Sequence, residues 1–243
     1  MLYANGCSFT YGTGLADKKT SWPFELSELL GLDREKTLNE GISGVSNHYI
    51  VRSTIKTLSD LLADGEKPFV AIGLTSPSRR EHFIEDKNLL IHNIPSPSYH
   101  GNIRLTTEEN TDLDQYNTIY MNNFWSPTYD FHNYMTNIIT LQNFFKYAGL
   151  EYIIFNSLNL TPNLVEPTKF TEVCEQADMV NVAKQLDMSS IYEEQTFFTY
   201  MYDNDAFFED ENDNRYMHPN LEAHEDWAKI IFDDVVRTRE GNG

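Results

Sequence analysis

A serine and a histidine near opposite ends of the chain could together carry out nucleophilic catalysis. Ser8 follows a short apolar run, Leu2-Tyr3-Ala4, that ends in Asn5-Gly6 and indicates a buried strand running into a turn. His218 stands just before the last predicted helix. A serine hydroxyl is a weak nucleophile unless a base takes its proton, and an imidazole that titrates near neutrality suits that task. The simpler interpretation is that Ser8 caps a helix or lies in a turn, and that His218 is a surface residue.

Two further polar segments follow predicted strands. The segment Asn39-Glu40-Gly41-Ile42-Ser43-Gly44 comes after the second strand, and Gly73-Leu74-Thr75-Ser76 comes at the end of the third. Parallel sheets bind ligands at the carboxyl ends of their strands, so both segments could reach the same edge as Ser8. The glycines are also compatible with tight turns that have no role in a site.

Taken together, these segments resemble the SGNH (GDSL-type) hydrolase superfamily. Its first block is Gly-Asp-Ser, whose serine is the nucleophile, and this chain has Gly6-Cys7-Ser8. The second block, Asn-x-Gly-x-Ser-Gly, is matched at every defined position by residues 39–44, which assigns an oxyanion-hole amide to Gly44. The last block, Asp-x-x-His-Pro, is matched at His218-Pro219. The resemblance covers about the first 80 residues and the C-terminal block.

The chain departs from this pattern at three positions. Cys7 replaces the aspartate of the first block, and Thr75 stands where the third block, Gly-x-Asn-Asp, has its asparagine donor. Arg215 occupies the aspartate position of the last block, and a guanidinium cannot accept an imidazole N–H. Asp213, the nearest preceding aspartate, is then the candidate acid of the triad. Asp210 and a plain Ser-His dyad remain open.

The resemblance therefore implies a defined set of site residues. Ser8 would attack an acyl carbonyl, His218 would carry the proton, and Asp213 would orient the imidazole. Ser8, Gly44 and Thr75 would hold the developing oxyanion, where the loss of one donor costs about 2.7–4 kcal/mol. Because the chain is so acidic, Arg79 could hold a substrate carboxylate near the site, although a loop arginine is more often solvated or ion-paired.

Other assignments are less favoured by the sequence. Gly6, Gly12 and Gly14 follow a strand, but neither Gly-x-Gly-x-x-Gly nor Gly-Lys-Thr is present, which argues against nucleotide binding. Cys7 could be the nucleophile, but we expect its side chain to point into the core as a small hydrophobe. His224 is expected to face solvent or to pack in the first turn of the last helix.

The elements that must position these residues alternate between strands and helices. Apolar runs predict strands at residues 2–4, 37–39, 69–73 and 152–155, and helical spacing predicts helices at 22–30, 50–62, 129–150 and 221–236. This order favours a three-layer α/β/α domain with a flavodoxin-like parallel sheet. We expect one domain over residues 1–243 with an insertion at about 81–125, a β-hairpin followed by a long loop. The acidic stretch at 202–213 is expected to be an exposed loop.

Composition excludes several classes of protein. The chain has 243 residues, of which 40% are hydrophobic and 23% charged, typical of a packed domain rather than a disordered one. A formal net charge of −19 argues against nucleic-acid binding. No apolar run is long enough to span a membrane, and the N-terminus lacks the basic start of a signal peptide, so we expect a cytoplasmic protein. Two cysteines make neither a disulfide framework nor a zinc site, and no metal or cofactor is expected.

The resemblance implies a serine esterase or O-deacetylase that acts through an acyl-enzyme on acyl esters of glycans or lipids. The variants Gly6-Cys7-Ser8-Phe9-Thr10-Tyr11-Gly12 and Thr75-Ser76-Pro77-Ser78-Arg79 are similar to SGNH-like proteins encoded by tailed bacteriophages, which would place the chain in the host cytoplasm or the virion. The alternative is a non-catalytic SGNH-like protein, either structural or glycan-binding, such as a virion component. The expected partner is an acylated small molecule or glycan; contacts with a virion or between copies of the chain stay open.

Overall fold

A parallel β-sheet forms the centre of the protein. In the computed structural model, the described residues are 1–84, 89–93, 119–120, 122–160, 174, 179–208 and 216–241. Within them the strand order is β2-β1-β3-β6-β7, and all neighbours are parallel. This is the flavodoxin-like order, so the predicted fold class is confirmed. The strands are β1 (Leu2–Gly6), β2 (Leu38–Asn39), β3 (Phe69–Leu74), β6 (Tyr152–Asn156) and β7 (Ile191–Tyr192).

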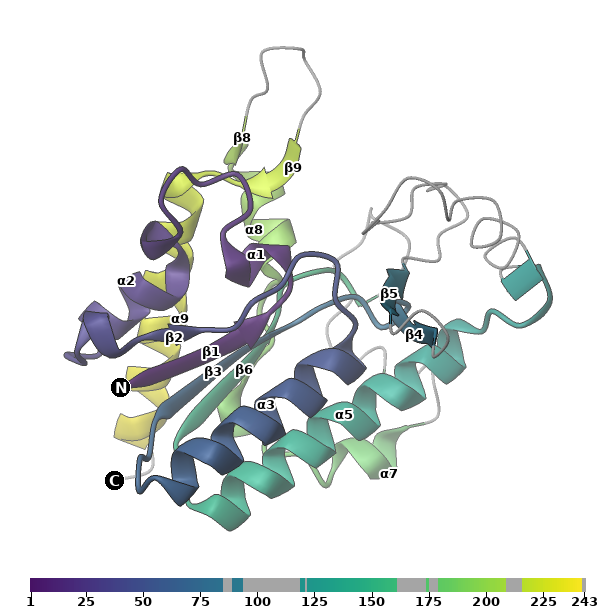
Figure 1. The fold of residues 1–243 in the computed structure, drawn as a ribbon, viewed down its shortest axis with the longest axis horizontal. Helices are drawn as coiled ribbons and strands as arrows, with labels where there is room; N and C mark the ends of the chain where they lie inside the picture. The colour runs from purple at the N-terminus through teal and green to yellow at the C-terminus, as the bar shows by residue number, and fades with distance from the viewer. Residues whose placement is uncertain are drawn as a thin grey trace.

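Helices cover both faces of the sheet (Figure 1). On one face lie α3 (Asn47–Ala63), α5 (Pro127–Ala148) and the short α7 (Val180–Ala183); on the other, α2 (Trp22–Leu29) packs against α9 (Leu221–Gly241). Every residue of β1 and β3 is buried. Such continuous burial is what a parallel sheet between two helical layers requires.

The two long helices on this face, α3 and α5, begin at residues that supply a cap. Ser46 accepts a hydrogen bond from the Tyr49 N–H at the start of α3, and Ser126 accepts one from the Tyr129 N–H at the start of α5. These bonds satisfy N–H groups that have no partner within the helix. Gly149 ends α5 in the left-handed conformation. Among the described residues, no helix is both long and apolar enough to cross a bilayer.

Two antiparallel hairpins lie beside the sheet. The first, β4 (Arg80–Ile84) with β5 (Leu89–Asn93), falls where the sequence predicted a hairpin at the start of the insertion. The second pairs β8 (Phe207–Phe208) with β9 (Tyr216–Pro219). The loop expected at 202–213 is therefore wrong for its described part, because α8 (Phe197–Asp203) ends within it and β8 follows. Phe207 is buried edge-on against Tyr202, which removes its apolar ring from water.

One edge of the sheet gathers the segments that the sequence analysis singled out. Strands β1 and β3 end there, and the short helix α1 (Ser8–Tyr11) follows β1 directly. Strand β9 contacts α1, and α8 lies beneath them on the face that carries α9 (Figure 1). Ser8 and His218, separated by most of the chain, thus lie on neighbouring elements.

Candidate active site

Ser8 is the first residue of α1, immediately after the strand β1. Cys7 occupies the N-cap position, and its side chain makes no capping hydrogen bond. Ser8 is 5% exposed, and its hydroxyl makes no hydrogen bond within the described part of the chain. The capping role that the sequence left open for Ser8 is therefore not the one it has. Cys7 is fully buried in the core, as predicted.

The turn after β2 holds α1 in place. The Asn39 side-chain amide donates to the Thr10 carbonyl at 2.8 Å, and the Ser43 and Thr13 hydroxyls are hydrogen-bonded at 2.6 Å. Gly41 lies so close to α1 that a Cβ atom there would be 2.5 Å from the Tyr11 backbone nitrogen. The second block of the motif therefore has a local physical role, because it fixes the helix that begins with Ser8.

Gly44 presents a backbone amide at the same turn. Its φ of 81° lies in the left-handed region, which favours glycine. The residue is buried but lies outside any helix or strand, and its N–H makes no hydrogen bond to a described residue. A buried amide of this kind is able to donate to an oxyanion if the oxyanion forms within reach.

Thr75 has only its hydroxyl to offer a ligand. Its backbone N–H donates to the Asn47 side-chain oxygen at 2.8 Å, and its carbonyl accepts from the Asn47 amide, also at 2.8 Å. Asn47, in the first turn of α3, thus clamps the turn after β3. Thr75 is 0% exposed, and its hydroxyl makes no hydrogen bond to any described residue. Asn47 was missed by the sequence analysis, because its partner lies 28 residues away.

His218 lies on β9 with its ring against α1. The centroids of the His218 and Phe9 rings are 5.7 Å apart, at an interplanar angle of 54°. Burial, and secondarily the positive charge of Arg79, lowers the pKa of His218 to about 4. His218 is therefore neutral at pH 7, the state that a general base requires.

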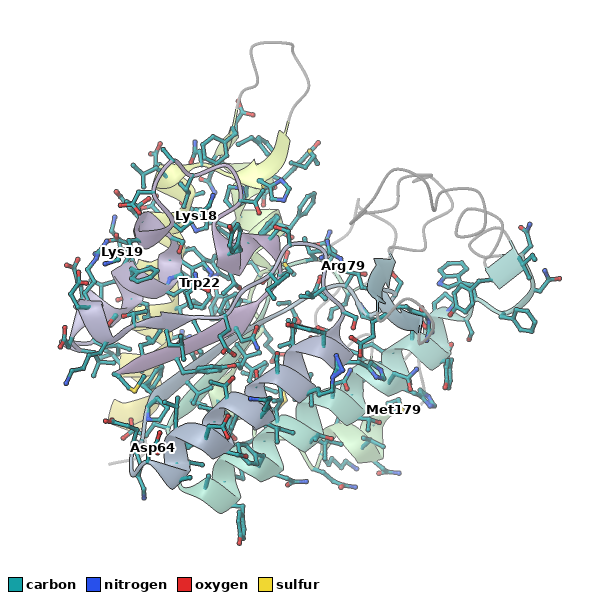
Figure 2. The ribbon with its side chains drawn as sticks, in the orientation of Figure 1. Lys18, Lys19, Trp22, Asp64, Arg79 and Met179 are labelled. Carbon is teal, nitrogen blue, oxygen red and sulfur yellow. The ribbon has the colours of Figure 1, made fainter. Side chains whose placement is uncertain are left out.

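Arg79 lies in the turn between β3 and β4, near the edge where β1 and β3 end (Figure 2). It is partly buried, and its charge acts on His218. The next residue, Arg80, has a different environment: it pairs with the buried carboxylate of Asp130 and lies over the Tyr120 ring at 4.9 Å. Of the two neighbouring arginines, Arg79 is the one whose charge acts on His218. Asp213, Asp210 and Arg215 lie outside the described residues.

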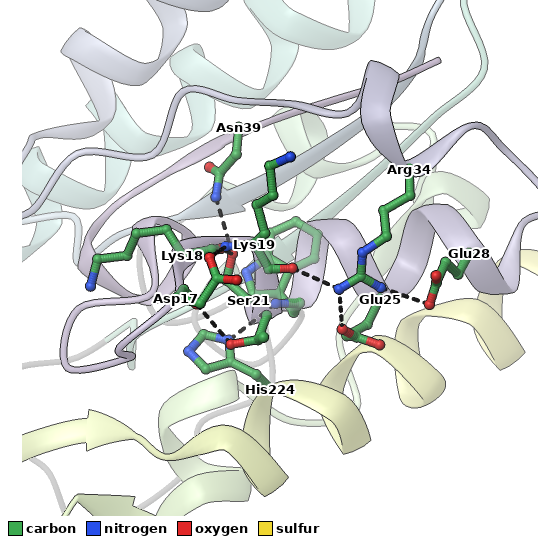
Figure 3. A network of polar contacts seen from close by, with 11 residues as sticks. Asp17, Lys18, Lys19, Ser21, Glu25, Glu28, Arg34, Asn39 and His224 are labelled. Carbon is green, nitrogen blue, oxygen red and sulfur yellow. Dashed lines mark hydrogen bonds and ion pairs between the residues drawn. The ribbon is translucent and has the colours of Figure 1, made fainter.

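His224 is buried in the first turn of α9, which is the second of the two alternatives that the sequence left open. It is 0% exposed, so the other alternative, that it faces solvent, is wrong. Its Nδ1 accepts a hydrogen bond from the Trp22 N–H at 3.2 Å and so caps α2 (Figure 3). Burial lowers the pKa of His224 to about 3, with smaller contributions from His218 and Lys18. The signal was present, because residue 224 shares a helical stripe with Trp227, Ala228 and Ile231, which are all buried.

The same polar network includes the N-cap residue of α2, Ser21. Its hydroxyl donates to the Lys18 carbonyl at 2.7 Å and does not accept a hydrogen bond from the helix. At the other end of the network, Arg34 pairs with Glu25 and Glu28 on α2 (Figure 3). Within the described ranges, no group of three or more His, Cys, Asp or Glu side chains is arranged to hold a metal ion.

Comparisons with known proteins give a family and a set of similar folds. Residues 11–241 match the model of DUF6071, a family of unknown function. No match is found among the curated proteins. Similar solved structures include TesA, with 16% identity, coverage of 98% of this chain and 96% of that chain, and a TM-score of 0.47.

Two other similar structures are an esterase and a lipase. The psychrotrophic esterase EstA from Pseudoalteromonas sp. has 15% identity, coverage of 99% and 96%, and a TM-score of 0.43. A GDSL-like lipase from Bacteroides thetaiotaomicron has 12% identity, coverage of 97% and 87%, and a TM-score of 0.44. Likeness at this level concerns the path of the chain and not its activity.

Proposed function

Because the chain belongs to DUF6071, a family of unknown function, we propose its activity from the site itself: a serine hydrolase that cleaves acyl esters through an acyl-enzyme. The contact between the Phe9 and His218 rings carries the proposal. It brings a neutral imidazole to the helix whose first residue is a serine with an uncommitted hydroxyl. A nucleophile and a base on adjacent elements, beside a buried free amide at Gly44, are the parts that acyl transfer needs.

The proposed reaction has two steps. In the first, Ser8 Oγ attacks the ester carbonyl while the imidazole of His218 takes its proton, and the oxyanion is held by the amides of Ser8 and Gly44 and by the Thr75 hydroxyl. The imidazolium then protonates the leaving alcohol as the C–O bond breaks. In the second step, a water molecule gives a proton to His218 and attacks the acyl carbonyl. The imidazolium then returns this proton to Ser8 Oγ as the acyl C–O bond breaks, which releases the acid and restores the serine hydroxyl. A lowered pKa at His218 favours the second half of each step, because it makes the imidazolium a stronger acid.

The substrate we propose is an O-acylated glycan or lipid, with a negative charge close to the ester. Arg79 is the observation that favours a charge, since it is a partly buried cation whose charge acts on His218 in a chain of net charge −19. A guanidinium can bind a carboxylate or phosphate with two parallel hydrogen bonds. Asp213 is retained in the proposal as the residue that would orient His218.

A fluorophosphonate probe tests the activity. It should label Ser8 covalently, and the Ser8→Ala variant should remain folded and unlabelled. Ser27→Ala is the matched control, because Ser27 is also buried with an unpartnered hydroxyl but lies on α2. Hydrolysis of p-nitrophenyl acetate should follow the same order. A folded protein that is labelled nowhere, and that hydrolyses nothing, would instead be the non-catalytic structural or glycan-binding protein of the alternative hypothesis, such as a phage virion component.

A further inference from the structure

We propose that the imidazole of His218 is positioned by packing against the ring of Phe9. The residue directly after Ser8 is then a positioning residue for the base. The inference rests on the proposed function and deepens it. Phe9 is not proposed to touch the substrate. It acts through His218, by fixing where the imidazole lies relative to the serine hydroxyl.

The contact between Phe9 and His218 is part of a continuous series of aromatic contacts. Phe9 is 2% exposed and contacts two other rings, the tilted ring of His218 and the edge-on ring of Phe197, the latter at 5.4 Å and 89°. Phe197 in turn stacks on Trp227 at 4.8 Å and 6°. The series of rings runs from β9 through α1 and α8 to α9. A buried side chain packed against two other rings has little freedom to change rotamer.

Side-chain hydrogen bonds fasten α1 and the turn that follows it, whereas the described part of β9 has only a short pairing. Asn39 at the end of β2 donates to the Thr10 carbonyl in α1, and Ser43 is hydrogen-bonded to Thr13 just after α1. Strand β9 pairs with the two-residue strand β8 across a register shift, and Asn220 just beyond it bonds to the Ala206 carbonyl. A short, irregular pairing fixes a strand less well than a continuous ladder. The side-chain contact with Phe9 therefore adds a constraint on His218 where the strand itself is weakly held.

The arrangement couples the nucleophile to its base within one helical turn. Ser8 and Phe9 are neighbours in α1, so a movement of the helix carries both the serine and the surface on which the imidazole lies. The Phe9 ring also shields His218 from water, and burial is the largest cause of its lowered pKa. Arg79 and His224 are described titratable groups whose fields couple to His218. Both residues are retained when Phe9 is replaced.

The test combines an activity-independent readout with a kinetic one. Phe9→Leu removes the flat ring and keeps an apolar side chain; Phe9→Tyr keeps the ring. Phe145→Leu is the matched control, since Phe145 is fully buried against Tyr152 on the opposite face of the sheet. NMR titration of the imidazole signals, with His218→Gln to assign the resonance, gives the pKa of His218. The rate of fluorophosphonate labelling gives the reactivity of Ser8.

The proposal predicts a specific pattern among these variants. In Phe9→Leu the pKa of His218 should rise toward 6.5 and labelling at pH 7 should slow by about tenfold to a hundredfold. Phe9→Tyr and Phe145→Leu should leave both near the wild-type values. An unchanged pKa and labelling rate in folded Phe9→Leu, or equal losses in Phe145→Leu, would overturn it. If the pKa of His218 rises as expected but Ser8 is never labelled in any variant, Phe9 does position His218, and the proposed hydrolase function is the part that fails.

Discussion

The clamp that Asn47 places on Thr75 gives a prediction whose size follows from the structure. Asn47 is 3% exposed, and its amide satisfies both the N–H and the carbonyl of Thr75, each at 2.8 Å. Asn47→Ala leaves one buried donor and one buried acceptor unpaired, at about 1–3 kcal/mol each. The free energy of unfolding should fall by about 2–6 kcal/mol. In a chain of this length each kcal/mol lowers the melting temperature by about 2–4 °C.

Urea unfolding and a thermal melt measure the loss directly. Asn137→Ala is the matched control, because Asn137 is also a buried helical asparagine but makes no hydrogen bond to a described residue, and its loss should cost less than about 1 kcal/mol. Labelling of Ser8 should also slow in Asn47→Ala, since the turn that carries Thr75 is released. If Asn47→Ala is as stable as Asn137→Ala, the two hydrogen bonds contribute nothing net and the clamp is not a support of the site.

Three further predictions concern the charged and titratable groups. A base must be deprotonated to act, so the rate of Ser8 labelling should be constant from pH 7 to about pH 5 and fall tenfold per pH unit below the His218 pKa of about 4. A pH profile of labelling with its midpoint near 6.5 would show that His218 is solvated. Arg79→Gln should move that midpoint upward and slow the hydrolysis of anionic esters more than neutral ones; equal effects on both would remove Arg79 from substrate binding. The pKa of His224 is lower in the folded protein than in the unfolded chain. The neutral side chain therefore contributes stability that is present above about pH 6.5 and is lost toward pH 3, by about 1.4 kcal/mol per pH unit. The His224→Gln variant should show a weaker loss of stability at acid pH in urea titrations.

The layered fold could be predicted because its signals are local. The residues of β1 and β3 are all buried, so each strand reads as an apolar run, and the buried positions of α3 recur every three or four residues. Helix α1 could not be predicted in this way, since four residues are too few to show a period. Strand β8 was not predicted for the same reason, since it has only two residues, and the acidic residues around it favoured the prediction of a loop.

In the candidate site, too, the features that follow from local sequence could be predicted and the long-range contacts could not. Ser8 and the turn at residues 39–44 could be placed because each follows a strand that the sequence reveals. The contacts that support them could not, because the Trp22–His224 hydrogen bond spans 202 residues and the Phe9–His218 contact joins the two ends of the chain. Such contacts depend on how the layers pack, which residue spacing within one element does not encode.

Cys7 stands where the SGNH motif that the chain resembles has an aspartate, and the burial of Cys7 gives a testable reason for this difference. The Cys7 side chain is fully buried in the core, and it makes no bond to the helix that it precedes. A carboxylate there would be an uncompensated buried charge, costing about 3–5 kcal/mol. Support of α1 comes instead from Asn39 and Ser43.

Introducing the aspartate of the SGNH motif at position 7 should therefore lower the stability of the protein. Cys7→Asp should be less stable than Cys7→Asn, which has the same shape without the charge. Burial raises the pKa of such an aspartate, so the deficit should be full at pH 8 and shrink as the pH falls and the carboxyl becomes protonated. Urea unfolding of both variants at pH 8 and pH 5 measures this difference. Equal stability of the two at pH 8 would mean that residue 7 tolerates a charge, and that the burial of Cys7 does not explain the departure.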